Sequence, residues 1–157
     1  MTAVADDSAT RFNTHATGIV TGETGIMIVG PSGSGKSALA YACLVAARRA
    51  GLFSALVGDD RLDIAITGDA AIMRGPSAIA GLLEIRGAGI LRHETIHEAR
   101  IDLVVRPVDP ARDDRLPPDD ERFDLGGGLS RPLIRVPRTM CEPLSLIFDL
   151  ARQRHQI

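Results

Sequence analysis

The sequence contains few aromatic residues, few cysteines and no excess of charge of either sign. Its 157 residues include no tryptophan, one tyrosine and four phenylalanines, so the core must be built from aliphatic side chains and alanine. Cys43 and Cys141 lie far apart, outside any CxxC or Cys/His spacing, which speaks against a disulfide framework or a zinc site. Acids and bases are mixed and the formal net charge is −2, so nothing indicates a nucleic-acid partner.

Long apolar runs are also missing. No run approaches the roughly 20 residues that a membrane-spanning helix needs. The first residues, "MTAVADDSATRFNTH", carry acids and no apolar stretch typical of a signal peptide. We therefore expect a protein of the reducing cytoplasm with no membrane partner. The length fits one domain, with residues 1–12 as a flexible N-terminal segment and residues 13–157 as the domain.

The apolar pattern predicts more strands than helices. Two short strands are expected around a turn at Glu23–Gly25, and Lys36–Ala50 is expected to form a helix capped by Gly51. Other expected elements are strands within 53–66, 70–75, 82–91, 101–108 and 132–137, a long irregular segment over 109–128, and a closing helix over 143–153. Because several strands follow one another directly, the sequence favours an α/β fold with a mixed β-sheet and a few helices.

The most specific local pattern is GxxxxGK[ST], the phosphate-binding loop. An aliphatic strand precedes it and a helix follows, which is the context that the motif requires. Glycines let backbone N–H groups converge on phosphate at a helix N-terminus. Lys36 would reach the β- and γ-phosphates of ATP, and the hydroxyl of Ser37 would bind Mg²⁺. The predicted nucleotide-binding residues are Gly30, Pro31, Ser32, Gly33, Ser34, Gly35, Lys36 and Ser37.

A second polar site is the acidic pair Asp59–Asp60 in "GDDR", directly after an apolar strand. Beside bound ATP and Mg²⁺, one carboxylate can hold the metal while the other accepts a proton from an incoming hydroxyl. The alternative is an Asp-rich turn that leads into the next strand. The pair by itself leaves both interpretations open.

The segment "LLEIRGAGI" favours the catalytic interpretation. Glu84 and Arg86 are two residues apart, so in an extended segment they project from the same face. The acid can bind metal and the guanidinium can meet phosphate oxygens, whereas a surface ion pair is the alternative. Gly87 and Gly89 indicate close approach of a ligand or another backbone. His15, just before the first strand, is expected near the phosphate loop.

Together and in this order, a histidine before a hairpin, "GPSGSGKS", "GDDR", "LLEIRGAGI" and "DRL" resemble the catalytic domain of the HPr kinase/phosphorylase family. The resemblance extends from His15 over nearly the whole chain, and "LEIRG-x-GI" is its most specific part. It implies a P-loop fold similar to phosphoenolpyruvate carboxykinase, a cytoplasmic hexamer, and regulation of a phosphotransferase system. Many members carry a further N-terminal domain, so the chain resembles the shorter members that consist of the catalytic domain.

The resemblance also implies roles for single residues. An ATP- and Mg²⁺-dependent kinase would phosphorylate a serine of the carrier protein HPr or an HPr-like partner. Asp59 or Asp60 would be the base, and the choice between them stays open. In the loop, Arg115 matches the catalytic arginine of the family, and Arg122 is the competing match. The implied catalytic residues are His15, Lys36, Asp59, Asp60, Arg86 and Arg115, and the implied Mg²⁺ ligands are Ser37 and Glu84.

Two departures from the family pattern affect the expected activity. Family members usually carry an acid after the P-loop serine, and this chain has Ala38. The stretch that resembles "PVxxGR" and is tied to dephosphorylation reads "VPRTMCE", which retains Pro137 and offers Arg138 as a partial substitute. We therefore expect a kinase with weak or absent phosphorylase activity. The alternatives are a nucleotide-sensing regulatory module without turnover, for which Ala38 is the motive, and an unrelated small-molecule P-loop kinase, which "LEIRGAGI" disfavours.

Overall fold

A computed structural model describes residues 9–155 of the chain. Most of the predicted N-terminal segment, residues 1–8, lies outside the described residues. Within residues 9–12 the first strand already begins, at Thr10. The predicted division at residue 12 therefore falls inside this strand, and the domain assignment itself stays a prediction.

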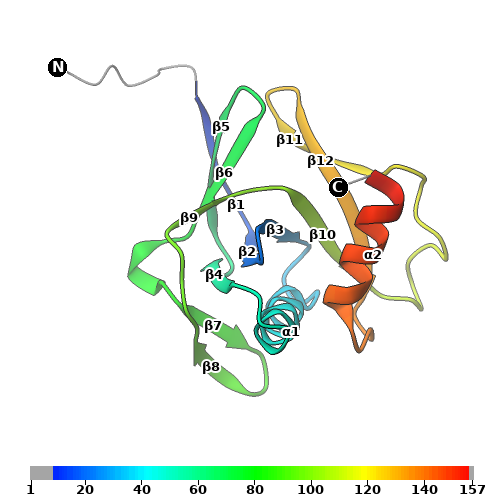
Figure 1. Cartoon of the computed structure of the whole chain (residues 1–157), viewed down its shortest axis with the longest axis horizontal. Helices are drawn as coiled ribbons and strands as arrows, with labels where there is room; N and C mark the ends of the chain where they lie inside the picture. Colours follow the sequence, from blue (N-terminus) through cyan, green and yellow to red (C-terminus); the bar gives the residue numbers. More distant parts are fainter. Residues whose placement is uncertain (1–8, 156–157) are drawn as a thin grey trace.

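The described residues form twelve strands, two α-helices and one short 3₁₀ helix (Figure 1). In chain order these are β1 (Thr10–Thr14), β2 (Ala16–Thr21), β3 (Thr24–Val29), α1 (Lys36–Arg49), β4 (Ser54–Gly58), β5 (Leu62–Thr67), β6 (Ala70–Arg74), η1 (Ser77–Ile79), β7 (Leu82–Ile85), β8 (Gly89–Arg92), β9 (Glu98–Arg100), β10 (Leu103–Val108), β11 (Arg122–Gly126), β12 (Leu129–Pro137) and α2 (Pro143–His155). None of the helices described is long and apolar enough to cross a membrane.

A six-stranded sheet forms the centre of the molecule, in the order β11-β12-β10-β3-β2-β4. Strands β3, β10 and β12 are parallel neighbours, whereas β2 runs antiparallel to both β3 and β4. The predicted mixed α/β fold is confirmed. Strands β2, β3 and β4 are buried along nearly their whole length, which explains why they have continuous apolar sequences rather than alternating ones.

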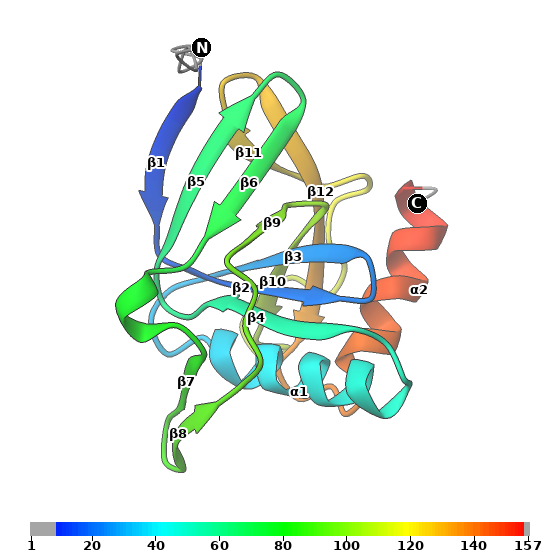
Figure 2. The ribbon, with the colours of Figure 1, turned by 60° about the vertical axis from the view of Figure 1, so that its left-hand side comes forward.

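Two apolar cores lie on opposite faces of this sheet, so the fold has three layers (Figures 1 and 2). On one face α1 and α2 pack against side chains such as Ile28 and Val105. On the other face the antiparallel sheet β1-β5-β6-β9 contributes Ile64 and Met73. Strand β5 is covered on one face only, and its residues alternate between buried and exposed.

The direction of the strands brings three connections to one edge of the central sheet. Since β4 and β3 both run antiparallel to β2, they share a direction, and β10 is parallel to β3. The P-loop follows β3, the pair Asp59–Asp60 follows β4, and the irregular segment 109–121 follows β10. Ligands of open α/β sheets bind at the carboxyl ends of such strands, so this edge is where a site is expected.

Three of the sequence predictions were wrong in detail. The turn between β2 and β3 was expected at Glu23–Gly25, but it lies at Gly22 and Glu23, with Gly22 at φ 61°, and Gly25 belongs to β3. Residues 82–91 were expected to be one extended segment, but β7 and β8 form a hairpin whose turn contains Gly87 at φ 83°. The irregular segment was expected to reach residue 128, but β11 pairs with β12 from Arg122 onward. Strand β11 escaped detection because only Phe123 and Leu125 of its side chains turn toward the second core.

Candidate active site

One pocket, of about 350 Å³, collects most of the predicted functional residues. It lies at the edge where β3 and β4 end, and the β7–β8 hairpin forms its outer wall. Its lining consists of His15, Ser32, Gly33, Gly35, Lys36, Ser37, Ala38, Asp59, Asp60, Glu84, Ile85 and Arg86. The structure thus brings together residues from four separate sequence motifs.

The P-loop connects β3 to α1 through left-handed and other glycine-favouring conformations. Gly30 has φ 149°, and a Cβ at this position would lie 2.6 Å from Ser34 Oγ. Gly35 is the N-cap of α1 at φ 95°, and it offers no side chain to the first helical turn. The first N–H groups of a helix have no intrahelical acceptor, so those of α1 remain available to an anion at the pocket.

Lys36 is the buried cation of this loop, with only 6% of its surface exposed. Its Nζ donates to the carbonyl oxygens of Gly30 at 2.8 Å and Pro31 at 3.0 Å. Burial lowers the pKa of Lys36, and the negative charges of Asp60 and Asp59 partly offset this shift. A cation in this setting gains from a further anionic partner.

The residues present fit a phosphate-bearing nucleotide. Ser34 Oγ is buried in the loop and has no hydrogen-bond partner within the described residues, and Lys36 and the α1 N-terminus supply positive potential. Within residues 9–155, no group of three or more His, Cys, Asp or Glu side chains is arranged so that it could hold a metal ion by itself. A Mg²⁺ ion fits this donor set, since Mg²⁺ in nucleotide sites is held by one or two protein oxygens together with phosphates and water.

Asp59 is the buried member of the acidic pair, at 8% exposure. Its Oδ1 accepts hydrogen bonds from Ser37 Oγ and from Thr17 Oγ1, each at 2.8 Å. Its Oδ2 accepts from the backbone N–H of Glu84 at 3.2 Å. Asp59 therefore joins the P-loop, β2 and β7 at one carboxylate. Thr17 was not among the site residues predicted from sequence. The one sequence feature that could have indicated it is a threonine within an otherwise apolar strand.

Asp60 has a very different environment. Its side chain is 75% exposed, and its Oδ1 lies 3.1 Å from Nδ1 of His15. Its backbone has φ 68°, a left-handed conformation that few residues other than glycine adopt. This turn directs two adjacent carboxylates to different places: Asp59 toward Ser37, and Asp60 toward His15 at the open side of the pocket.

The β7–β8 hairpin carries Glu84 and Arg86 to the pocket, although not from one extended strand. Strand β7 ends at Ile85, so Arg86 lies in the turn rather than in the strand, but both side chains line the same pocket. Arg86 Nη2 donates to Ser32 Oγ at 2.9 Å, which ties the hairpin to the P-loop. Glu84 is exposed and lines the pocket.

Arg115 of "DRL" and its competing match, Arg122 of "ERFDLGG", both lie outside this pocket. Arg115 is exposed in segment 109–121 and does not line the pocket. Arg122 donates to Oγ and to the carbonyl oxygen of Ser130 across the β11–β12 hairpin, at 2.8 and 3.1 Å. Segment 109–121 is held at its ends by ion pairs of Asp109 with Arg138 and of Glu121 with Arg135.

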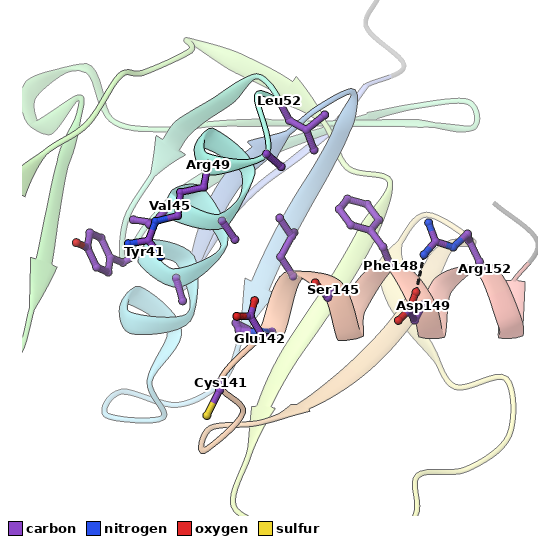
Figure 3. Close-up of a pocket in the computed structure, with 15 residues that line it drawn as sticks. Tyr41, Val45, Arg49, Leu52, Cys141, Glu142, Ser145, Phe148, Asp149 and Arg152 are labelled. Atoms are coloured by element: carbon purple, nitrogen blue, oxygen red, sulfur yellow. Dashed lines mark hydrogen bonds and ion pairs between the residues drawn. The ribbon is translucent and has the colours of Figure 1, made fainter.

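A larger groove of about 870 Å³ lies between α1 and α2 (Figure 3). Tyr41, Val45 and Phe148 line it, and Asp149 and Arg152 pair with each other at one end (Figure 3). The groove contains none of the residues predicted from sequence and no glycine loop. The smaller pocket at the P-loop is therefore the candidate active site.

Comparison with known proteins relates this arrangement to one family. The family described as HPr Serine kinase C-terminal domain matches residues 6–152. A protein of Geobacter sulfurreducens named HPr kinase/phosphorylase is 31% identical over 147 residues, which cover 83% of this chain and 42% of that protein. A protein of Clostridium beijerinckii with the same name is 34% identical over 94 residues, 60% of this chain and 29% of its own length. The chain thus spans less than half of either relative.

The fold itself is similar to a solved structure. The HPr(Ser) kinase/phosphatase from Coxiella burnetii superposes with a TM-score of 0.71 at 24% sequence identity. The match covers 92% of this chain and 97% of that one. At this identity the likeness establishes the fold, and it agrees with the fold type that the motifs predict.

Proposed function

Because the chain belongs to the family of the HPr Serine kinase C-terminal domain, we propose that it is a kinase that acts with ATP and Mg²⁺ on a serine of HPr or an HPr-like carrier protein. Such a kinase would regulate a phosphotransferase system. The observation that carries the proposal is the meeting of the P-loop, the acidic pair and the β7–β8 hairpin in one pocket. A P-loop alone would serve many nucleotide-binding proteins.

In this proposal the P-loop side of the pocket binds the phosphates. Bound ATP would supply the terminal phosphoryl group, and Mg²⁺ would offset the charge of its phosphate oxygens. Lys36 and the N–H groups of α1 provide the positive potential. Arg86, already bonded to Ser32, adds a second cation on the same side. Ser37 and Glu84, which line the pocket, would hold the metal through their oxygen atoms.

The environments of the two aspartates favour Asp60 as the general base. Both oxygens of Asp59 already accept hydrogen bonds from the protein, three in all. The carboxylate of Asp59 is therefore held in place beside Ser37, the proposed metal ligand, and is poorly placed to accept a proton from the substrate. Asp60 is open to the pocket mouth, where an acceptor hydroxyl would arrive, and His15 contacts it. Asp60 would take the proton of the acceptor serine as the oxygen of that serine bonds to the γ-phosphorus of ATP and the bond from this phosphorus to ADP, the leaving group, breaks.

Incubation of the chain with ATP, Mg²⁺ and a purified HPr-like protein tests the proposal, with phosphoserine measured by mass spectrometry. We expect transfer in the unmodified chain and at least about 100-fold slower transfer in Lys36→Ala and in Asp60→Asn. Asp60→Asn should retain nucleotide affinity, whereas Asp59→Asn should weaken binding that depends on Mg²⁺. Asp69→Asn, an exposed acid outside the pocket, is the matched control and should transfer normally.

One observation favours a second candidate, a nucleotide-sensing module without turnover. The first turn of α1 has no acidic residue, since Ala38 stands there. If the chain binds nucleotide tightly and in a Mg²⁺-dependent manner but forms no phosphoserine on any HPr-like protein, the nucleotide-sensing module would be favoured over the kinase. Transfer that continues undiminished in both Lys36→Ala and Asp60→Asn would contradict the assigned roles.

A further inference from the structure

Thr17 lies in the middle layer of the molecule, yet its side chain reaches the candidate site. We propose that Thr17 is a positioning residue that fixes the carboxylate of Asp59 and, through it, the hydroxyl of Ser37. This role rests on the proposed nucleotide and Mg²⁺ binding at the P-loop. Thr17 is fully buried, and its Oγ1 donates to Asp59 Oδ1 at 2.8 Å over 42 positions of sequence.

The register of the strands explains why these two residues meet. In the antiparallel pair of β2 and β4, Gly18 lies opposite Gly58. In an antiparallel pair the next facing positions are Thr17, one residue before Gly18, and Asp59, one residue after Gly58. The side chain of Thr17 therefore lies beside the carboxylate of Asp59, just past the end of β4. The contact is therefore built into the sheet rather than into a flexible loop.

Two hydroxyl groups converge on one oxygen of Asp59. Ser37 Oγ donates to Oδ1 at the same distance as Thr17 Oγ1. A hydroxyl has one proton and two lone pairs, so the bond to Asp59 uses the proton of Ser37 and leaves its lone pairs for a cation. Thr17 holds Oδ1 where Ser37 can donate to it, and the backbone N–H of Glu84 holds Oδ2.

The hydrogen bond between Ser37 and Asp59 matters more because the first turn of α1 offers no carboxylate of its own. This turn contains no acidic residue, and within residues 9–155 Asp59 is the carboxylate that accepts from Ser37. Removal of the Thr17 donor leaves a largely buried carboxylate oxygen with one donor fewer. A buried charged group that loses a hydrogen bond tends to rotate or to admit water, and Ser37 would then lose its fixed orientation.

The same strand contains a matched control. Thr21 is also buried in β2, at 1% exposure, but its Oγ1 has no hydrogen-bond partner within the described residues. Thr17→Val and Thr21→Val make the same chemical change in the same strand. The first removes a donor to Asp59, and the second removes a hydroxyl that bonds nothing there.

The experiment measures the dissociation constant of ATP by calorimetry, with and without Mg²⁺, for the unmodified chain and each variant. We expect Thr17→Val to reduce the gain in affinity that Mg²⁺ confers by about tenfold, the loss typical of a hydrogen bond to a charged group. Affinity without Mg²⁺ should change little. Thr17→Ser should restore the gain, and Thr21→Val should match the unmodified chain. Thr17→Ala replaces Thr17→Val if the valine variant does not fold.

The expected coupling is checked in a second background. Thr17→Val should add no further loss to Asp59→Asn, because both act through one carboxylate. Equal losses with and without Mg²⁺, or additive losses in the double variant, would show a structural role only and overturn the proposal. An unchanged Mg²⁺ effect in Thr17→Val would overturn it while the proposed function stands. An unmodified chain that binds no nucleotide would overturn both.

Discussion

Neighbouring side chains in this molecule differ sharply in their surroundings. Asp59 is nearly buried and accepts three hydrogen bonds, while Asp60 is exposed and contacts one histidine. A buried carboxylate is stable only when donors replace its lost water, so Asp59 is held in place by its partners. The left-handed backbone of Asp60 separates the two side chains. One dipeptide thus offers a fixed carboxylate and an open one.

The two cysteines show a similar contrast, and their reactivity is predictable. Burial in α1 raises the pKa of the Cys43 thiol to about 12, whereas Cys141 is exposed before α2. Since the thiolate is the reactive form, Cys43 stays protonated and inert at pH 8.5. Iodoacetamide should add one carbamidomethyl group to the native unmodified chain and none to the native Cys141→Ser variant. After denaturation the unmodified chain should gain two groups. Intact-mass spectrometry counts the groups added. Two rapid additions to the native chain would contradict the burial of Cys43.

The raised pKa of Cys43 also makes the free energy of unfolding depend on pH. The ordinary pKa of a cysteine thiol is 9.0, so between about pH 9 and pH 12 the unfolded chain releases the thiol proton and the folded chain retains it. The contribution of this group to the free energy of unfolding is therefore complete below pH 9 and declines as pH rises toward 12.

At the scale of elements, the ends of β4 and β6 approach so closely that only glycine fits. A Cβ on Gly75 would lie 2.1 Å from the carbonyl oxygen of Val57, and one on Gly58 would lie 2.7 Å from the Cα of Gly75. A Cβ on Gly18 would meet only side chains, the nearest at 2.8 Å. Gly75 packs against Val57 and Gly58, the two residues that precede Asp59. This contact therefore also fixes the backbone position from which the acidic pair starts.

We expect Gly75→Ala to destabilise the chain by about 3 kcal/mol, because the backbone of β4 must move, and Gly18→Ala by about 1 kcal/mol, because Met73 can yield. Urea unfolding followed by circular dichroism measures both. Gly75→Ala should also weaken nucleotide binding, since Asp59 would shift. Equal stability of the two variants would contradict the close approach.

Local patterns were enough to predict the elements that position the P-loop. Helix α1 with Gly51 after its end, β4 and α2 appear where apolar spacing and glycine placed them, and the β2–β3 hairpin forms with its turn at Gly22 rather than at Gly25. The β7–β8 turn was missed because Gly87 and Gly89 were attributed to a ligand rather than to a hairpin. The Thr17–Asp59 bond depends on strand register across 42 positions, which no local pattern contains.

At the scale of the whole molecule, the edge of the central sheet also holds "VPRTMCE", the segment for which the family resemblance implies a part in dephosphorylation. Pro137 ends β12, and Arg138 follows at the same edge as the P-loop because β12, β10 and β3 are parallel. Nη2 of Arg138 donates to Asp109 Oδ2 at 2.7 Å, and its N–H donates to the carbonyl oxygen of Val108. Arg138 thus anchors the start of segment 109–121.

We therefore expect the kinase direction to dominate. Phosphorolysis of a phosphoserine requires that inorganic phosphate be held in line with the phosphoserine, and an arginine already paired with Asp109 is a poor partner for this phosphate. Incubation of the chain with phosphoserine-HPr and inorganic phosphate should release pyrophosphate at least about tenfold more slowly than the same preparation phosphorylates HPr with ATP. The forward rate is the internal control that the protein is folded and active. Pyrophosphate release as fast as the forward reaction would contradict this expectation, and would mean that another cation at this edge binds the attacking phosphate.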